Sequence, residues 1–187
     1  MLVMVDSQFR HSFLIFCIAL GMGNAQAAPA GISWPEGWQV EDLGAQTPPA
    51  GQTAAQSRQR AAKLDAAGNP VMVMELTESN LQPGHQVNVE GVLLEMRKAV
   101  QVNFARSGFQ SVCTRARPTD LGHIPAIETT CTVTQNGVHV MTQTLVAAAS
   151  AAKAWSLSYA GSAEGYVAAK DEALQIREGL RLEGAQE

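Results

Sequence analysis

Residues 124–149 read IPAIETTCTVTQNGVHVMTQTLVAAA and contain the clearest fold signal of the chain. Asn136-Gly137 accepts the positive φ angles of a type I′ turn, the turn that joins two antiparallel strands most tightly. After the turn, Val138, Val140 and Val146 alternate with polar or apolar residues of the opposite face. The stretch predicts an antiparallel hairpin of residues 124–134 with residues 138–149.

The segments on either side of this hairpin continue the β pattern. Residues 109–117 are expected to form a strand that pairs with 124–134 across a loop from Pro118 to His123. On the far side, residues 154–159 (AWSLSY) alternate large apolar with small residues. These four strands predict an antiparallel meander.

Two segments change to helical spacing. The first, 86–107, carries one apolar stripe that Val92 and Ala99 widen, and Gly108 is placed to end it. The second, 163–181, follows Ser162 as a plausible N-cap. The stripe residues are Val89, Leu93, Met96, Val100 and Phe104 in the first helix, and Tyr166, Ala169, Ala173, Ile176 and Leu180 in the second.

The N-terminal half predicts a short strand and a second hairpin. Trp34 and Trp38 flank a turn into a strand at 39–43, and their proximity indicates a packed edge of the core, with a sugar-binding platform as the alternative. Residues 44–56 lack periodicity and are expected to be a loop. Residues 58–65 and 71–78 flank a Gly-Asn-Pro turn. The run Val71-Met72-Val73-Met74 predicts a central strand covered on both faces, its methionines filling the core rather than binding Cu(I).

This order of elements predicts an α+β fold, an antiparallel sheet of about six to seven strands flanked by two amphipathic helices. It resembles the PsbP/Mog1-like fold. The resemblance rests on Trp34-Pro35-x-Gly37-Trp38, the helix 86–107, the strand 154–159 and the closing helix 163–181. The mature chain also resembles small secreted gram-negative bacterial proteins of unknown function built on that fold. The resemblance implies an extracytoplasmic, non-enzymatic binding or assembly role.

The first residues have the pattern of a secretory signal peptide at 1–27. A charge at Arg10 precedes a short apolar run, and Ala25 and Ala27 stand before a cleavage point between Ala27 and Ala28. A buried N-terminal helix or membrane anchor is the alternative. Residues 28–33 are then a short N-terminal linker, 34–183 a single domain and 184–187 a frayed tail. We therefore expect a periplasmic or secreted protein without stable membrane insertion.

The signal peptide also decides the cysteine count. Of three cysteines, Cys17 leaves with the signal, and Cys113 and Cys131 remain in an oxidising compartment. The two are symmetric about the expected 109–117/124–134 hairpin, so that register sets them opposite one another. We predict a disulfide between Cys113 and Cys131; two buried free thiols are the alternative, and no C-x-x-C motif supports a redox site.

Motifs for catalysis, cofactors or metals are missing from the sequence. Thirteen Lys+Arg against seventeen Asp+Glu, a net charge of −4, argue against nucleic acid. His85, His123 and His139 lack metal-ligand spacing, so each is expected to be a surface or satisfied polar residue. A triple of Ser111, His123 and Asp120 can be selected, but such triples arise by chance. We therefore expect a protein without enzymatic activity, without a cofactor and without a bound metal ion.

The predicted function is therefore binding. The first hypothesis is an exported, non-enzymatic binding or assembly module that contacts another envelope or extracellular protein through a sheet face or the loop 44–56. The alternative is a small-ligand or metal carrier with a pocket between sheet and helix, and a hydrolase with an unrecognised site ranks third. Arg106, Arg115 and Arg117 form either a solvated face or a small patch that binds anions or carboxylates.

Overall fold

The structure is a computed structural model that describes residues 31–46 and 56–182. The expected signal peptide 1–27, its Ala27/Ala28 cleavage point, most of the loop 44–56 and the tail 184–187 lie outside these residues. Within these described residues, eight strands and two helices follow one another in the order β1, β2, β3, α1, β4, β5, β6, β7, β8, α2. Their bounds are β1 Trp38–Gln46, β2 Gln56–Leu64, β3 Pro70–Asn80, α1 Val89–Arg106, β4 Gln110–Cys113, β5 Arg117–Leu121, β6 Ile124–Gln135, β7 Val138–Ala149, β8 Lys153–Ser162 and α2 Ala163–Glu178.

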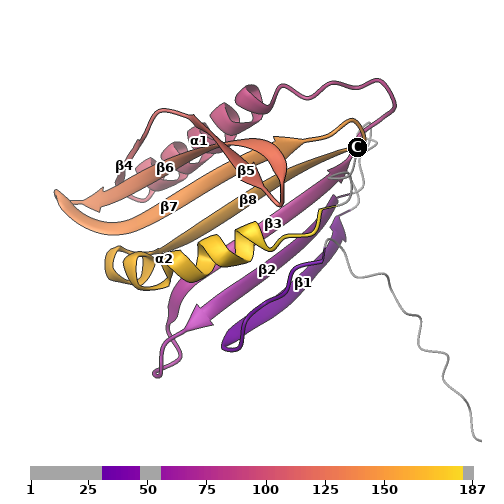
Figure 1. Cartoon of the computed structure of the whole chain (residues 1–187). Helices are drawn as coiled ribbons and strands as arrows, with labels where there is room; N and C mark the ends of the chain where they lie inside the picture. Colours follow the sequence, from indigo (N-terminus) through magenta and orange to yellow (C-terminus); the bar gives the residue numbers. More distant parts are fainter. Residues whose placement is uncertain (1–30, 47–55, 183–187) are drawn as a thin grey trace, which may run out of the picture.

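All strands join one antiparallel sheet, which confirms the predicted fold class. The strand order is β1-β2-β3-β8-β7-β6-β4, and β5 pairs with β6 on the same edge as β4. The sheet is therefore eight-stranded, although its two shortest strands share one position. β8 returns to pair with β3 and so joins the N-terminal hairpin to the C-terminal meander (Figure 1).

The two helices cover opposite faces of the sheet (Figure 1). α2 packs on β3, β7, β8 and β5 over the larger core, which contains Trp38, Met72, Met74, Trp155 and Leu157. α1 packs on β7, β6 and β4 over a smaller core around Leu93, Cys113, Cys131, Leu145 and Ala147. No helix of the described segments is long and apolar enough to cross a membrane.

The helix ends follow from local hydrogen bonds. Asn88 caps α1 by accepting a hydrogen bond from the Gly91 N–H at 3.0 Å, so this helix begins at Val89 and not at 86. Ser162 caps α2 in the same way through the Gly165 N–H at 3.0 Å, as predicted. Gly108 follows α1 with a φ of 79°, which fits its predicted place after the helix.

α2 approaches the sheet closely because small residues lie on its inner face. Ala169 and Ala173 are 1% and 0% exposed. A Cβ added at Gly161 or at Gly165 would meet the Val71 carbonyl oxygen at 2.5 Å. Glycine at these two positions therefore permits the contact between the start of α2 and β3.

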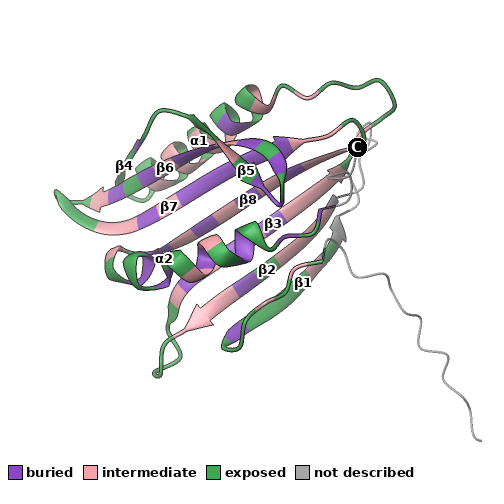
Figure 2. Ribbon diagram, viewed as in Figure 1, coloured by how far each residue is buried: buried purple, intermediate pink, exposed green. Residues whose placement is uncertain are grey.

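Two predictions about coverage were wrong, for one reason. Val71 and Val73 are only half-buried, so β3 is fully covered on one face, the face of Met72 and Met74 (Figure 2). Val92 and Ala99 are exposed instead of widening the buried stripe. Both follow because α1 lies over β7, β6 and β4 and does not extend over β3.

The expected loop from Pro118 to His123 was also wrong, because residues 118–121 belong to β5. Only Gly122 and His123 form the turn, both with positive φ (53° and 69°). Three residues, 114–116, lie opposite two residues of β6 between β4 and β5. The one additional residue on this side lets the turn lie at Gly122 and His123 while Cys113 still pairs with Cys131.

The predicted disulfide is present in the structure. Cys113 and Cys131 are bonded, with Cα atoms 3.8 Å apart across the β4–β6 pair. Cys131 is fully buried beneath α1. The bond thus fastens the short edge strand β4 to β6 under the helix.

The tryptophans form a packed edge, as the favoured interpretation predicted. Trp38 is 8% exposed and donates from Nε1 to Glu172 of α2 at 2.8 Å. Trp34 packs on it at 5.6 Å between ring centroids. At the end of the expected linker, Gly31 bridges to Arg181 and Ile32 packs on the core.

Candidate functional site

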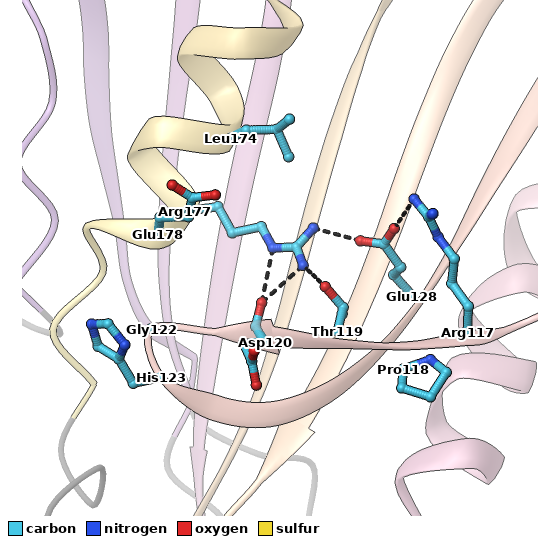
Figure 3. Close-up of a pocket in the computed structure, with 10 residues that line it drawn as sticks. All are labelled: Arg117, Pro118, Thr119, Asp120, Gly122, His123, Glu128, Leu174, Arg177 and Glu178. Atoms are coloured by element: carbon cyan, nitrogen blue, oxygen red, sulfur yellow. Dashed lines mark hydrogen bonds and ion pairs between the residues drawn. The ribbon is translucent and has the colours of Figure 1, made fainter.

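A polar pocket of about 390 Å³ lies between the C-terminal half of α2 and β5 (Figure 3). We call it the arginine pocket. Strand β5 crosses beneath the end of α2, and the turn at Gly122 and His123 closes one side. Its lining residues are Arg117, Pro118, Thr119, Asp120, Gly122, His123, Glu128, Leu174, Arg177 and Glu178.

Arg177 forms the floor of the arginine pocket and holds β5 against α2. Its Nε and Nη2 donate to the Asp120 carbonyl oxygen at 3.0 and 2.8 Å, and Nη2 also donates to the Thr119 hydroxyl. Its Nη1 donates to Glu128 Oε2 at 2.5 Å. The guanidinium is thus shared between a backbone carbonyl, a hydroxyl and a carboxylate, which together accept from four of its five N–H donors.

Glu128 accepts from two arginines of very different exposure. Its own side chain is 5% exposed, that of Arg177 7% and that of Arg117 72%. Arg117 reaches Glu128 Oε1 from β5, as the dashed line in Figure 3 shows. Because Arg177 already neutralises the buried carboxylate, the Arg117 guanidinium is the member that can move to another acceptor.

The turn of Gly122 and His123 at the side of the pocket has a backbone conformation that requires glycine at position 122. A Cβ on Gly122 would lie 2.6 Å from the Leu180 carbonyl oxygen, so only glycine fits there. His123 follows at a positive φ of 69° and is exposed at the rim, away from the Arg177 guanidinium (Figure 3). The chain just after α2, at Leu180, thereby fixes the position of His123.

A buried chain of hydroxyls lies on the same face of the sheet. Thr130 bonds Thr144 at 2.9 Å, and Thr144 bonds the Tyr166 hydroxyl of α2 at 2.6 Å. Burial raises the pKa of Tyr166 to about 12, against the opposing effect of its hydrogen bond with Thr144. The Tyr159 ring stacks on Tyr166 at 5.9 Å. Burial thus keeps the phenol neutral, and its hydrogen bond with Thr144 gives α2 a further polar attachment to the sheet.

The arginine patch considered from the sequence is not formed as a unit. Arg117 lines the arginine pocket. Arg106 ends α1 on the opposite face of the sheet, and Arg115 is exposed between β4 and β5. Only Arg117 therefore belongs to the pocket.

The chance triple is separated in the structure. His123 and Asp120 both line the arginine pocket, but Ser111 pairs with Val133, near the other end of β6, about 30 Å along the strand from the turn at His123. His139 bonds Thr142 at 2.9 Å, and His85 lines a different pocket beside α1. Among residues 31–46 and 56–182, no group of three or more His, Cys, Asp or Glu is placed to hold a metal ion.

Glu128 and Arg177, the two buried charged residues of the site, were not identified from the sequence. A signal existed for each. Glu128 falls on the same strand face as Ala126, and Arg177 lies four positions after Ala173 and so on the buried helical stripe. A charged residue on each of two buried faces predicts an ion pair, since isolated buried charges are costly.

A comparison with protein-family models matches residues 29–182 to a domain of unknown function, DUF4946. The chain belongs to this family. No curated protein matches it. Among solved structures, it is similar to the solution structure of cyanobacterial PsbP (CyanoP) from Synechocystis sp. PCC 6803, with a TM-score of 0.57 and 10% identity. The match covers 86% of this chain and 96% of that one, and it confirms the predicted PsbP-like fold.

Proposed function

We propose that this DUF4946 protein is exported and acts as a non-enzymatic binding module, docking a segment of another envelope or extracellular protein in the arginine pocket. The observation that carries the proposal is the unequal sharing of Glu128. Its charge is balanced inside the fold by Arg177, while Arg117 remains 72% exposed at the pocket opening. An arginine so exposed to solvent is suited to exchange its intramolecular acceptor for the carboxylate of a docked protein.

The charges at the rim indicate the chemistry of the docked segment. Exposed Asp120 and Glu178 line the same pocket, with Glu178 on the side away from Arg117 (Figure 3), so the pocket presents both signs. A segment in which an acidic residue neighbours a basic one complements this arrangement. Like charges facing one another would disfavour a segment of a single sign.

Export is supported by the disulfide and by the signal-peptide pattern of residues 1–27. Disulfides persist in oxidising compartments and are rare in the cytosol. Cys113–Cys131 closes a separation of 18 residues and lies in the core under α1. A small exported domain commonly gains stability from such a bond.

A matched pair of charge reversals tests the docking. Arg117→Glu and Arg115→Glu change the net charge equally, but only Arg117 lines the arginine pocket. Disulfide-intact protein carrying either change is immobilised and exposed to envelope extract. We expect a specific protein retained by the wild type and by Arg115→Glu but lost with Arg117→Glu. Equal retention by all three forms contradicts docking at this pocket.

The second candidate function is the small-ligand carrier, and one observation favours it. A separate, mostly apolar pocket lies between α1 and the sheet, where that hypothesis expected one.

A further inference from the structure

A pocket of about 280 Å³ lies beside the first turn of α1, on the sheet face opposite the arginine pocket. We call it the α1 pocket. Its walls come from α1, from the loop before it and from strands β3, β8 and β7. The lining residues are Thr77, Ser79, His85, Val87, Val89, Val92, Ala147, Ala148, Ala154, Trp155 and Ser156.

The α1 pocket exists because the side chains under this end of the helix are small. Ala147, Ala154 and Ser156 face Val89 and Val92. Further along α1, the disulfide and the larger Leu93 and Leu145 fill the corresponding space. Within the described residues the α1 backbone makes no close contact with β8 or β3, so only the side chains of Val89 and Val92 reach over this part of the sheet.

The lining defines the chemistry of a ligand. Its walls are methyl groups of valine and alanine, and His85 is the single lining residue with an ionisable side chain. A charged ligand would lose its hydration there without gaining a fixed counter-ion. Thr77, Ser79 and Ser156 add hydroxyls that bond no other described side chain and can take one polar group of a ligand.

The volume limits the size of that ligand. A cavity of about 150 Å³ accommodates benzene. The α1 pocket, at about 280 Å³, therefore fits a fused two-ring aromatic or an aliphatic chain of about eight to ten carbons.

We propose that the α1 pocket binds a small, uncharged, largely apolar molecule with one hydrogen-bonding group, seated between Val92 and the Ala154–Ser156 floor. This site is independent of the arginine pocket, since the two lie on opposite faces of the sheet. Failure of either proposal leaves the other standing.

The test uses 2-naphthol as a neutral probe and 2-naphthoate as its charged relative, added to the native disulfide-bonded protein. Binding is followed by two-dimensional amide NMR. We expect saturable 2-naphthol binding that shifts the amides of Val92, Ala147 and Ser156, and about tenfold or more weaker binding of 2-naphthoate. No saturation up to the solubility limit, shifts centred elsewhere, or tighter binding of 2-naphthoate overturns the proposal.

Two variants with a matched control locate the binding. Val92 and Val102 are exposed valines of the same helix, at 38% and 44%, but only Val92 lines the pocket. Val92→Asp is expected to weaken 2-naphthol binding about tenfold or more, and Val102→Asp to leave it unchanged. Ala154→Phe, which fills the floor, gives the same loss without adding charge. Equal binding in all three variants overturns the assignment.

Discussion

Arg177 of α2 and Glu128 of β6 form an ion pair in which both side chains are buried, 7% and 5% exposed, although 49 positions separate them in the chain. The pair joins the closing helix to the sheet, and the remaining donors of Arg177 hold β5 in place. It is therefore a structural attachment whose outer partner, Arg117, is open to solvent. Arg177 therefore stabilises the fold, whereas Arg117 is the arginine proposed to bind the partner protein.

Removing Arg177 is expected to destabilise the fold strongly. Arg177→Met leaves the Glu128 carboxylate buried without its inner partner, which costs about 3–5 kcal/mol in the free energy of unfolding. Urea unfolding measures the change. The double variant Arg177→Met/Glu128→Gln is expected to recover part of the loss, because no buried charge remains. A loss below about 1 kcal/mol in the single variant contradicts the burial of the pair.

Removing Arg117 is expected to change stability little. Its side chain is 72% exposed, so water screens its attraction to Glu128. Arg117→Met is predicted to shift the free energy of unfolding by less than about 1 kcal/mol in the same urea experiment. A loss as large as that of Arg177→Met would show that Arg117 is needed for folding and is not available to a partner.

The disulfide is expected to contribute about 3 kcal/mol of stability, given the 18-residue separation of Cys113 and Cys131. The double variant Cys113→Ala/Cys131→Ala should lower the free energy of unfolding by about that amount. Intact-mass measurement of the unreduced wild type should show a mass lower by two hydrogen atoms than that of the reduced chain. Two thiols open to alkylation in the native protein would contradict the bond.

The close contact of α2 with β3 is expected to be sensitive to one methyl group. In Gly161→Ala the new Cβ would lie 2.5 Å from the Val71 carbonyl oxygen and 2.9 Å from the Tyr166 nitrogen. Such overpacking costs about 1–3 kcal/mol in the free energy of unfolding. Gly31→Ala is the control, because its new Cβ would lie 3.7 Å from the Arg181 Cβ, an ordinary van der Waals distance. Equal melting temperatures of the two variants in thermal unfolding would contradict this close packing.

Tyr166 is expected to make stability fall at high pH. Its pKa rises from 10.0 to about 12 through burial, so in that interval the unfolded chain loses the phenol proton while the folded chain keeps it. The folded state then binds more protons, and the free energy of unfolding decreases as pH rises from 10 to about 12. Tyr166→Phe removes this decline. Parallel pH curves for wild type and variant, measured by urea unfolding, would contradict the shift.

Most of the fold could be predicted because its signals are local. The Asn136-Gly137 turn predicted the β6–β7 hairpin, and helical spacing with Ser162 predicted the start of α2. The β5 strand could not be predicted in this way. Its Pro118 and Asp120 favour loops, and pairing with residues 124–128 of β6 overrides that preference.

The candidate site was harder to predict because it depends on how distant elements pack. Arg117 was identified as a candidate patch residue, but periodicity does not show that Glu128 and Arg177 meet, since the position of α2 across the sheet decides it. Whether β3 is covered on both faces likewise depends on where α1 lies over the sheet. α1 lies over β7, β6 and β4, and a sequence pattern gives a helix its apolar face but not its position.

In-cell photocrosslinking from the rim of the arginine pocket tests the central claim most directly. A photoreactive amino acid at His123 would be activated in intact cells in three backgrounds: wild type, Arg115→Glu and Arg117→Glu. We predict a discrete crosslinked product with an envelope or extracellular protein in the first two and its loss in Arg117→Glu. No product in any background, or one that persists unchanged in Arg117→Glu, would contradict docking at this pocket.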